Sequence, residues 1–216
     1  MNKKKKAVIF GSNGQAEVVA FLLNADSEYE VSAFCVSRDF RSSNVFYNRP
    51  LVDFETVQEK FPPAEYEMFV SLSYADQNRV RERFYYEAKE KGYKLLTYVS
   101  SKSTCWTEKV GDNCFIFEDN TIQPFVEIGS NVILWSGNHI GHHSTIEDNV
   151  FVSSHVVISG HCRIGRNSFL GVNSTLRDAI TLGEYTTLGA GCLIVKDTPP
   201  DNIYIGTKSQ LYVKKN

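Results

Sequence analysis

The second half of the chain carries a six-residue repeat, which constrains the fold more than any other feature of the sequence. Every sixth residue between positions 110 and 194 is Ile, Leu or Val, without an exception. This period fits neither an α-helix, which repeats every 3.6 residues, nor a simple alternating strand. It is typical of a parallel β-helix, in which each coil consists of three short strands and three corners. We therefore predict about five coils.

The other positions of the six-residue unit support this interpretation. The aliphatic residue is expected to point into the β-helix, and a glycine or a small polar residue is expected to let the chain turn a corner. A small residue recurs four positions after the aliphatic one. Three cysteines, Cys114, Cys162 and Cys192, occupy this small position. We therefore interpret them as packing residues and not as nucleophiles.

Residues 5–100 follow a different pattern. Predicted strands cover 5–11, 30–37, 67–73 and 94–100, and predicted helices cover 11–25, 54–61 and 76–92, the last beginning at an Asp76 cap. Strands that alternate with helices indicate a parallel sheet covered by helices, as in a Rossmann-like α/β domain. We place this domain at residues 1–103 and an all-β parallel β-helix at residues 104–216.

A glycine turn, Gly11-Ser12-Asn13-Gly14, follows the first predicted strand and opens the first helix. Glycines let the backbone approach a phosphate closely, and the N–H groups of a helix N-terminus favour an anion. The turn lacks the third glycine of the dinucleotide motif, and the second strand ends at Ser37 without an acidic residue to hold a ribose, which disfavours NAD. Two interpretations stay open, a site for another phosphate-bearing ligand and a plain strand–helix turn.

All five histidines lie in the repeat, and His139, His142 and His143 fall within five residues. They flank a corner, where a β-helix has no structural need of imidazoles. Histidine changes its charge closest to neutral pH and is a suitable general base. Three interpretations remain: a general base at a subunit cleft, a metal site, and solvated corner residues. Solvated corner residues are less favoured than a general base. A metal site is the least favoured of the three, because carboxylates and a regular ligand spacing are missing. His155 and His161 are expected at the surface or behind the site.

Bulk properties exclude several classes of protein. A net charge of −2 and a pI of about 6.2 do not predict a nucleic-acid partner. No apolar run approaches the roughly 18 residues of a membrane span, and the run after Lys3–Lys6 is too short for a signal peptide. We expect a cytoplasmic protein in which Lys3–Lys6 is a solvated tail. The scattered cysteines without a CxxC pair predict reduced thiols.

The repeat resembles that of the left-handed β-helix, or hexapeptide-repeat, acyltransferases. The segments GSNGQAEVV, DQNRVRERFYYEAKEKGYKLLTYVS and ILWSGNHIGHHSTIEDNVF resemble in particular the bacterial nucleotide-sugar acetyltransferases of the PglD and NeuD type, perosamine N-acetyltransferase among them. The resemblance covers about residues 5–208. It implies a Rossmann-like domain that holds a nucleotide-linked amino sugar, a homotrimer with acetyl-CoA between neighbouring β-helices, no metal, and a role in surface polysaccharide or glycan synthesis.

The resemblance also implies roles for individual residues. It makes His142 the general base and puts His143 where the family has a carboxylate. The residues implied at the nucleotide sugar are Gly11, Ser12, Asn13, Gly14 and Ser37, with Asn138 and His139 near the acceptor amine. The residues implied at CoA are Ser159, Gly160, Ala179 and Ala190, and the segment IGTKSQL at 205–211 would approach the adenine. Trp135, Phe151 and Phe169 are expected to be exposed and are candidates for the trimer interface.

The predicted reaction is acetylation of the sugar amine by direct attack on the thioester. The missing carboxylates mildly favour an amine, because an alkoxide would depend more on an oriented histidine. Acetylation of a hydroxyl on a sialic-acid-like sugar is the first alternative. A β-helix scaffold without catalytic activity is the second, and a failure to bind acetyl-CoA would favour it.

Overall fold

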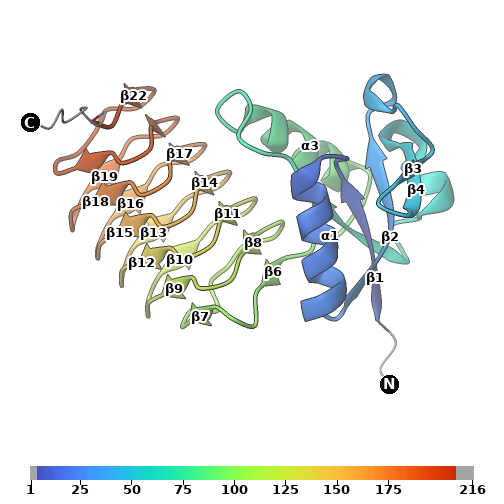
Figure 1. The fold of residues 1–216 in the computed structure, drawn as a ribbon, viewed down its shortest axis with the longest axis horizontal. Coiled ribbons are helices and arrows are strands. Elements are labelled where there is room, and N and C mark those ends of the chain that lie inside the picture. Colours follow the sequence, from blue (N-terminus) through green and yellow to red (C-terminus); the bar gives the residue numbers. More distant parts are fainter. Residues whose placement is uncertain (1–3, 208–216) are drawn as a thin grey trace, which may run out of the picture.

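The computed structural model describes residues 4–207 and shows a sheet-and-helix part beside a long β-helix (Figure 1). The sheet of the first part has the strand order β3-β4-β2-β1-β5, and all its neighbours are parallel except β3 and β4. Its elements are β1 (Lys5–Phe10), α1 (Gly14–Asp26), β2 (Tyr29–Val36), η1 (Arg38–Phe40), β3 (Val45–Phe46), β4 (Arg49–Asp53), η2 (Phe54–Thr56), α2 (Val57–Lys60), β5 (Tyr66–Val70) and α3 (Arg79–Glu90).

The two faces of this sheet are covered differently. Helix α1 packs through Val19 and Leu23 on one face, in a cluster that continues into the first coils of the β-helix. Helices α2 and α3 pack through Val57 and Phe84 on the other face. The burial of both sheet faces explains why the central strands are nearly continuous apolar runs. No helix among the described residues is long and apolar enough to cross a bilayer.

Three expectations about this part need correction. The predicted strand over 94–100 is divided: Leu95 bridges to β5, whereas β6 (Tyr98–Val99) pairs with the β-helix. Helix α3 begins after Asn78 and not at Asp76, because the chain from Asp76 to Asn78 is in the left-handed region. The lysine run is not a free tail as far as it is described, because strand β1 begins at Lys5 and Lys5 pairs with Glu28 at 2.6 Å.

The second part has parallel strands stacked into three sheets, and its shape fits a left-handed β-helix. We name the sheets the junction face, the second face and the third face, in the order in which the chain visits them in each coil. The junction face contains β6 (Tyr98–Val99), β8 (Phe115–Ile116), β11 (Ile133–Leu134), β14 (Phe151–Val152), β17 (Phe169–Leu170), β20 (Thr187–Leu188) and β22 (Ile203–Tyr204). The second face contains β7 (Thr104–Cys105), β9 (Thr121–Ile122), β12 (His139–Ile140), β15 (Val157–Ile158), β18 (Thr175–Leu176) and β21 (Leu193–Ile194). The third face contains β10 (Glu127–Ile128), β13 (Thr145–Ile146), β16 (Arg163–Ile164) and β19 (Thr181–Leu182).

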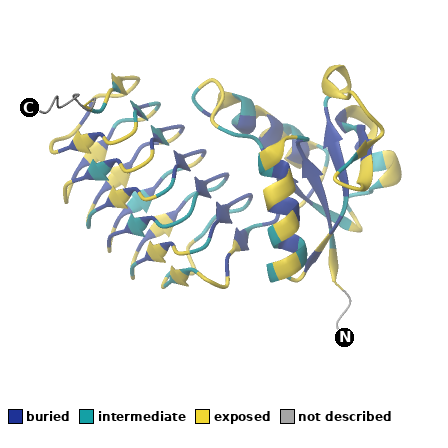
Figure 2. Ribbon diagram, viewed as in Figure 1, coloured by how far each residue is buried: buried dark blue, intermediate teal, exposed yellow. Residues whose placement is uncertain are grey.

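The interior of the β-helix confirms the sequence pattern. The repeated aliphatic residues, from Ile116 to Ile194, form one buried cluster, and Val110 packs against its end. The small residues four positions later, such as Cys114 and Ser144, are buried with them. In Figure 2 the β-helix strands nearest the first part of the chain are dark, whereas the strands and corners away from it include many exposed residues.

The expected role of the repeated glycines is wrong. Gly111, Gly129 and Gly141 do not adopt positive φ, and the corners are instead turned by residues two positions later, such as Asn131 and His143, with φ near +58°. Asn, Asp and His are the residues that tolerate this left-handed region best after glycine. The glycines are needed for close approach, because a Cβ at Gly141 would overlap the backbone of the next coil.

One corner of the β-helix holds a ladder of buried asparagines, which we call the asparagine corner. Nδ2 of Asn113 donates to Oδ1 of Asn131 at 2.7 Å, and Nδ2 of Asn131 donates to Oδ1 of Asn149 at 2.8 Å. Helix α3 contacts this corner through Arg81, whose buried guanidinium donates to the backbone carbonyl oxygens of Asn131 and Asn149. The two parts of the chain are therefore joined by a buried polar network as well as by apolar contacts, although Nε of Arg81 has no hydrogen-bond partner among the described residues.

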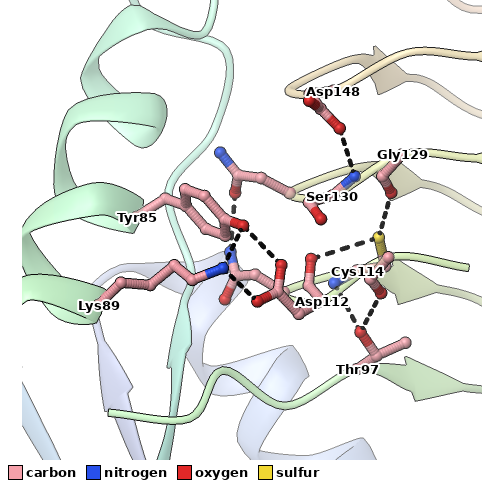
Figure 3. Close-up of polar contacts among 11 residues, drawn as sticks. Tyr85, Lys89, Thr97, Asp112, Cys114, Gly129, Ser130 and Asp148 are labelled. Atoms are coloured by element: carbon pink, nitrogen blue, oxygen red, sulfur yellow. Dashed lines mark hydrogen bonds and ion pairs between the residues drawn. The ribbon is translucent and has the colours of Figure 1, made fainter. Parts of the chain in front are cut away.

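A second contact joins the far end of α3 to the first coil (Figure 3). The Tyr85 hydroxyl donates to one carboxylate oxygen of Asp112 at 2.6 Å, and Nζ of Lys89 donates to the other at 2.7 Å. Partial burial raises the pKa of Asp112, but the hydrogen bonds from Lys89 and Tyr85 outweigh this and hold the pKa below its ordinary value. The ionised carboxylate therefore stabilises the junction.

The aromatic residues expected at an outer interface lie mainly inside this junction. Phe151 is buried, and Trp135 and Phe169 are half-buried against the same cluster as α1. The prediction that they are exposed is wrong, because the first part of the chain covers the junction face.

Candidate active site

The glycine turn has the geometry that a close ligand approach requires. Gly11 has φ of +132°, and a Cβ there would lie 2.7 Å from the carbonyl oxygen of Ser71. Asn13 caps α1, because its side chain accepts a hydrogen bond from the N–H of Ala16 at 3.0 Å. Nothing lies within 4 Å of a Cβ at Gly14. The turn therefore leaves open space at the N-terminus of a thirteen-residue helix, where an anion is favoured.

A cavity of about 250 Å³ adjoins this turn at the carboxyl ends of β1 and β2. The lining includes Gly11, Ser12, Asn13 and Ser37 together with apolar side chains, and Arg83 from α3 supplies a cationic side chain. The structure thus brings together four of the residues predicted at the nucleotide sugar, with Gly14 opening the adjacent helix. Sequence reasoning missed Arg83, because nothing local marks the one arginine of the helix that faces a cavity.

A buried hydroxyl lies next to the turn. Oγ of Ser71, directly after β5, is fully buried and has no hydrogen-bond partner among residues 4–207. An unpaired buried polar group costs free energy, so such groups often mark a place where a ligand or water completes the bonding. Ser71 contacts Gly11 through its backbone, which supports the assignment of this region to a ligand with polar groups.

The second and third faces meet at what we call the histidine corner, which is occupied by equivalent residues of successive coils. Phe125, His143, His161 and Ala179 follow one another along this corner, and all four have positive φ. The rings of Phe125 and His143 lie 4.7 Å apart, and those of His143 and His161 lie 4.9 Å apart and nearly parallel. These separations match the spacing of hydrogen-bonded strands. The repeat itself therefore stacks the two imidazoles.

The ring of His142 lies beside this stack. Its exposed ring is nearly perpendicular to those of His143 and His161, and its Nδ1 lies 3.1 Å from Nδ1 of His143. Its backbone N–H donates to the side chain of Gln123 in the coil before. In the coil after, a Cβ at Gly160 would lie 3.0 Å from the His142 ring. The ring can lie over the next coil only because residue 160 has no side chain.

The predicted CoA residues divide between two corners. Ser159, Gly160 and Ala179 lie at the histidine corner, whereas Ala190 follows β20 and lies where the junction and second faces meet. The segment after Ile205 is described only to residue 207, so the predicted contact of residues 208–211 lies outside the described part. The structure therefore brings three of the four predicted CoA residues to the corner that also holds His142.

The two residues predicted near the acceptor have different environments. Asn138 is 1% exposed, and its Oδ1 accepts a hydrogen bond from the N–H of Val156 at 2.8 Å. Its side chain thus supports the coil from within. His139 is half-buried and begins β12, three residues before His142.

The glycine turn and the histidine corner lie on opposite sides of the β-helix. The first part of the chain packs on the junction face, and the histidine corner is formed by the other two faces. In a three-sided prism, that corner is the one farthest from the junction face. One small ligand cannot touch both sites within a single chain.

A larger cavity lies at neither site. It has a volume of about 770 Å³ and lies between α1 and the junction face, lined in part by Phe21 and Trp135. Two of its acidic groups are used within the fold: Glu118 accepts from the Ser136 hydroxyl at 2.7 Å, and Asp26 accepts from the Tyr98 hydroxyl at 2.7 Å. The candidate chemistry therefore rests with the glycine turn and the histidine corner.

The cysteines of the repeat are unsuited to nucleophilic catalysis. Burial raises the pKa of the Cys114 thiol to about 12 and also raises the pKa values of Cys162 and Cys192. Their thiolates are therefore scarce at neutral pH, and all three side chains belong to the core of the β-helix. This agrees with the prediction that they are packing residues.

Comparisons with known proteins define the class. The family model for the bacterial transferase hexapeptide (six repeats) matches residues 109–142, and that for the hexapeptide repeat of succinyl-transferase matches residues 162–196. The second part of the chain is thus a β-helix with transferase hexapeptide repeats, which confirms the predicted resemblance to hexapeptide-repeat acyltransferases. The search of curated proteins found no match.

Solved structures share the fold of nearly the whole chain. The acetyltransferase domain of PglB from Neisseria gonorrhoeae FA1090 has a TM-score of 0.84 at 24% identity, covering 94% of this chain and 97% of that one. A histidine-to-asparagine mutant of perosamine N-acetyltransferase from Caulobacter crescentus, in complex with CoA and GDP-perosamine, has a TM-score of 0.83 at 22% identity, covering 97% of each chain. WeeI from Acinetobacter baumannii AYE has a TM-score of 0.73 at 16% identity, covering 94% of this chain and 97% of that one.

Proposed function

We propose that this chain is an acetyl-CoA-dependent N-acetyltransferase that acetylates the amino group of a nucleotide-linked amino sugar. The observation that carries the proposal is the position of His142, whose exposed ring lies over Gly160 and is backed by His143. Support also comes from the relatives of the same fold, which include structures in complex with acetyl coenzyme A and with CoA and GDP-perosamine.

The proposed reaction is a direct attack of the unprotonated amine on the thioester carbonyl. The nitrogen–carbon bond forms, the carbon–sulfur bond breaks, and the amine proton passes to Nε2 of His142 and then to the departing thiolate of CoA. For Nε2 to accept, the ring hydrogen must be on Nδ1, from which it is donated to Nδ1 of His143. His143 thereby takes the orienting role that the resemblance gives to a carboxylate.

We assign the nucleotide sugar to the glycine turn and CoA to the histidine corner. In a Rossmann-like domain at residues 1–103, the glycine turn and the N-terminus of α1 would bind the phosphates, and the cavity beside Ser37 and Arg83 would hold the nucleoside. In the β-helix at residues 104–216, Ser159, Gly160 and Ala179 would line the pantetheine arm.

The separation of the two sites requires a second copy of the chain. A nucleotide sugar bound at the glycine turn of one copy reaches a histidine corner only if that corner belongs to a neighbour. A closed homotrimer repeats this arrangement three times. It also explains Ala190, which lies at a different corner and would face the same CoA from the adjoining copy. We place the enzyme in the cytoplasm.

The test is a thiol-release assay with acetyl-CoA and a panel of UDP-, dTDP- and GDP-linked amino sugars, with CMP-sialic acid and free sialic acid alongside. Release of CoA with one amino sugar is expected. His142→Ala should lower kcat/KM by about 10²- to 10⁴-fold while the fold stays intact. Release with the sialic acids alone would instead indicate O-acetylation, and a protein that does not bind acetyl-CoA would be a scaffold.

A further inference from the structure

The histidine corner has a second chemical property that general-base catalysis does not require. His142, His143 and His161 each present a ring nitrogen, and these three atoms lie within 4.8 Å of one another. Among residues 4–207 this is the only group of three His, Cys, Asp or Glu side chains arranged in this way. All three side chains are exposed, so an ion could reach them from solvent.

The third histidine removes the sequence argument against a metal site. His142 and His143 alone give no ligand spacing, but His161 lies one coil later at the position equivalent to His143. The stacking of successive coils therefore supplies a ligand that no local motif reveals. Gly160 adds to this, because its missing side chain lets the His142 ring lean toward the coil that carries His161.

The spacing of the ring nitrogens is close to that of the ligands of a tetrahedrally coordinated ion. Two nitrogens bound to zinc at about 2.0–2.1 Å lie about 3.3–3.4 Å apart in a tetrahedron. The Nδ1 atoms of His142 and His143 lie 3.1 Å apart, so only a few tenths of an ångström separate them from ligand positions. A ring nitrogen of the exposed His161 lies within 4.8 Å of both, and a side-chain rotation would complete the set. Three imidazole nitrogens favour zinc, copper or nickel over magnesium or calcium.

From this geometry we propose that His142, His143 and His161 bind one divalent transition-metal ion, such as Zn²⁺, and that the ion inhibits acetyl transfer. The inhibitory role rests on the proposed function. A neutral imidazole that binds a metal through Nδ1 keeps its hydrogen on Nε2, and Nε2 is the atom that would accept the proton of the amine. The ion occupies the place of the hydrogen between His142 and His143, so base catalysis and metal binding exclude each other.

Binding is measured directly on the untagged full-length chain after treatment with a chelator. Zinc is titrated against a chromophoric chelator, and cobalt is titrated with its visible absorption as a report of tetrahedral coordination. We expect one ion per chain, and an affinity more than about tenfold lower in His143→Ala and in His161→Ala. His155→Ala is the matched control, since His155 is exposed at a different corner and also has positive φ. Equal affinities in wild type, His143→Ala and His161→Ala would overturn the site.

Inhibition is measured as the ratio of acetyl-transfer rates with and without saturating zinc. In the wild type, saturating zinc should lower the rate more than about tenfold, as expected for loss of a general base. In His161→Ala, zinc should lower the rate much less. Zinc bound at this site without any change in rate would overturn the inhibitory role. Absence of acetyl transfer in metal-free protein would count against the proposed function alone, because the binding titrations do not depend on activity.

Discussion

Nη2 of Arg81 donates a 2.7 Å hydrogen bond to the carbonyl oxygen of Asn149, and so bonds helix α3 to the middle of the β-helix. The guanidinium is fully buried and also donates to carbonyl oxygens of Asn131 and Ser73. It therefore saturates carbonyl groups that no water can reach. This residue fixes how the two parts of the chain meet.

Replacing Arg81 with Met should destabilise the protein by at least about 3 kcal/mol, because several buried carbonyl groups lose their donor. Urea unfolding followed by circular dichroism measures this. Arg83→Met is the control, since Arg83 makes an exposed pair with Glu87 and should change stability by less than about 0.5 kcal/mol. Equal effects of the two substitutions would contradict the role given to Arg81.

Asp26 should make the junction sensitive to acid. Hydrogen bonds from Ser101 and Tyr98 lower the pKa of its carboxyl to about 2 from an ordinary 3.8. Because the folded pKa is depressed, this stabilisation is complete above about pH 5 and is lost as the pH falls toward 2. Asp26→Asn should therefore be less stable than wild type at pH 7, and the difference should shrink on acidification. Thermal unfolding from pH 7 to pH 3 measures it, and a difference that grows in acid would refute the assignment.

Two glycines of neighbouring coils separate a catalytic effect from a structural one. Gly160→Ala puts a methyl group 3.0 Å from the His142 ring, which can move, so acetyl transfer should fall about tenfold or more while the melting temperature changes little. Gly141→Ala puts the methyl group into the backbone of Gly160, which cannot move. It should lower the melting temperature strongly. Full activity in Gly160→Ala would show that the ring position does not matter.

The opposite placement of the two sites predicts complementation between defective copies. Ser37→Trp should fill the nucleotide cavity, and His142→Ala removes the base. Each variant alone should be inactive in the thiol-release assay. In trimers assembled from an equal mixture, about one site in four pairs an intact cavity with an intact histidine from its neighbour, so about a quarter of the wild-type activity should return. No recovery after co-expression would place both halves of the site within one chain.

Much of the fold was predictable because the repeat is a local property of the sequence. An aliphatic residue at every sixth position, such as Ile140 and Ile146, is enough to indicate coils with a filled interior. The corners were not predictable from the same reasoning. Glycines such as Gly141 suggested turns by their composition, but their function depends on the distance between coils, which the sequence does not display.

The candidate site divides in the same way. His142 and His143 stand out because they are adjacent, and the glycine turn stands out because it follows a strand. His161 was expected only at the surface or behind the site, because it approaches His142 through the coil spacing and not along the chain. Arg81 was missed because its partners are backbone carbonyl groups, which carry no residue signature.

The asparagine ladder joins residues 18 positions apart, so each step of the ladder corresponds to one full circuit of the chain. The number of residues in this part of the chain therefore determines the corner at which each later side chain lies. An insertion or deletion of one circuit shifts the later coils along the axis but returns every side chain to its own corner. A change of six residues keeps the core apolar and still rotates everything beyond it by a third of a turn, which would carry the imidazoles of a later coil to a corner without His142. Such a protein would fold with an intact apolar core, but it would lose the arrangement of imidazoles at the histidine corner.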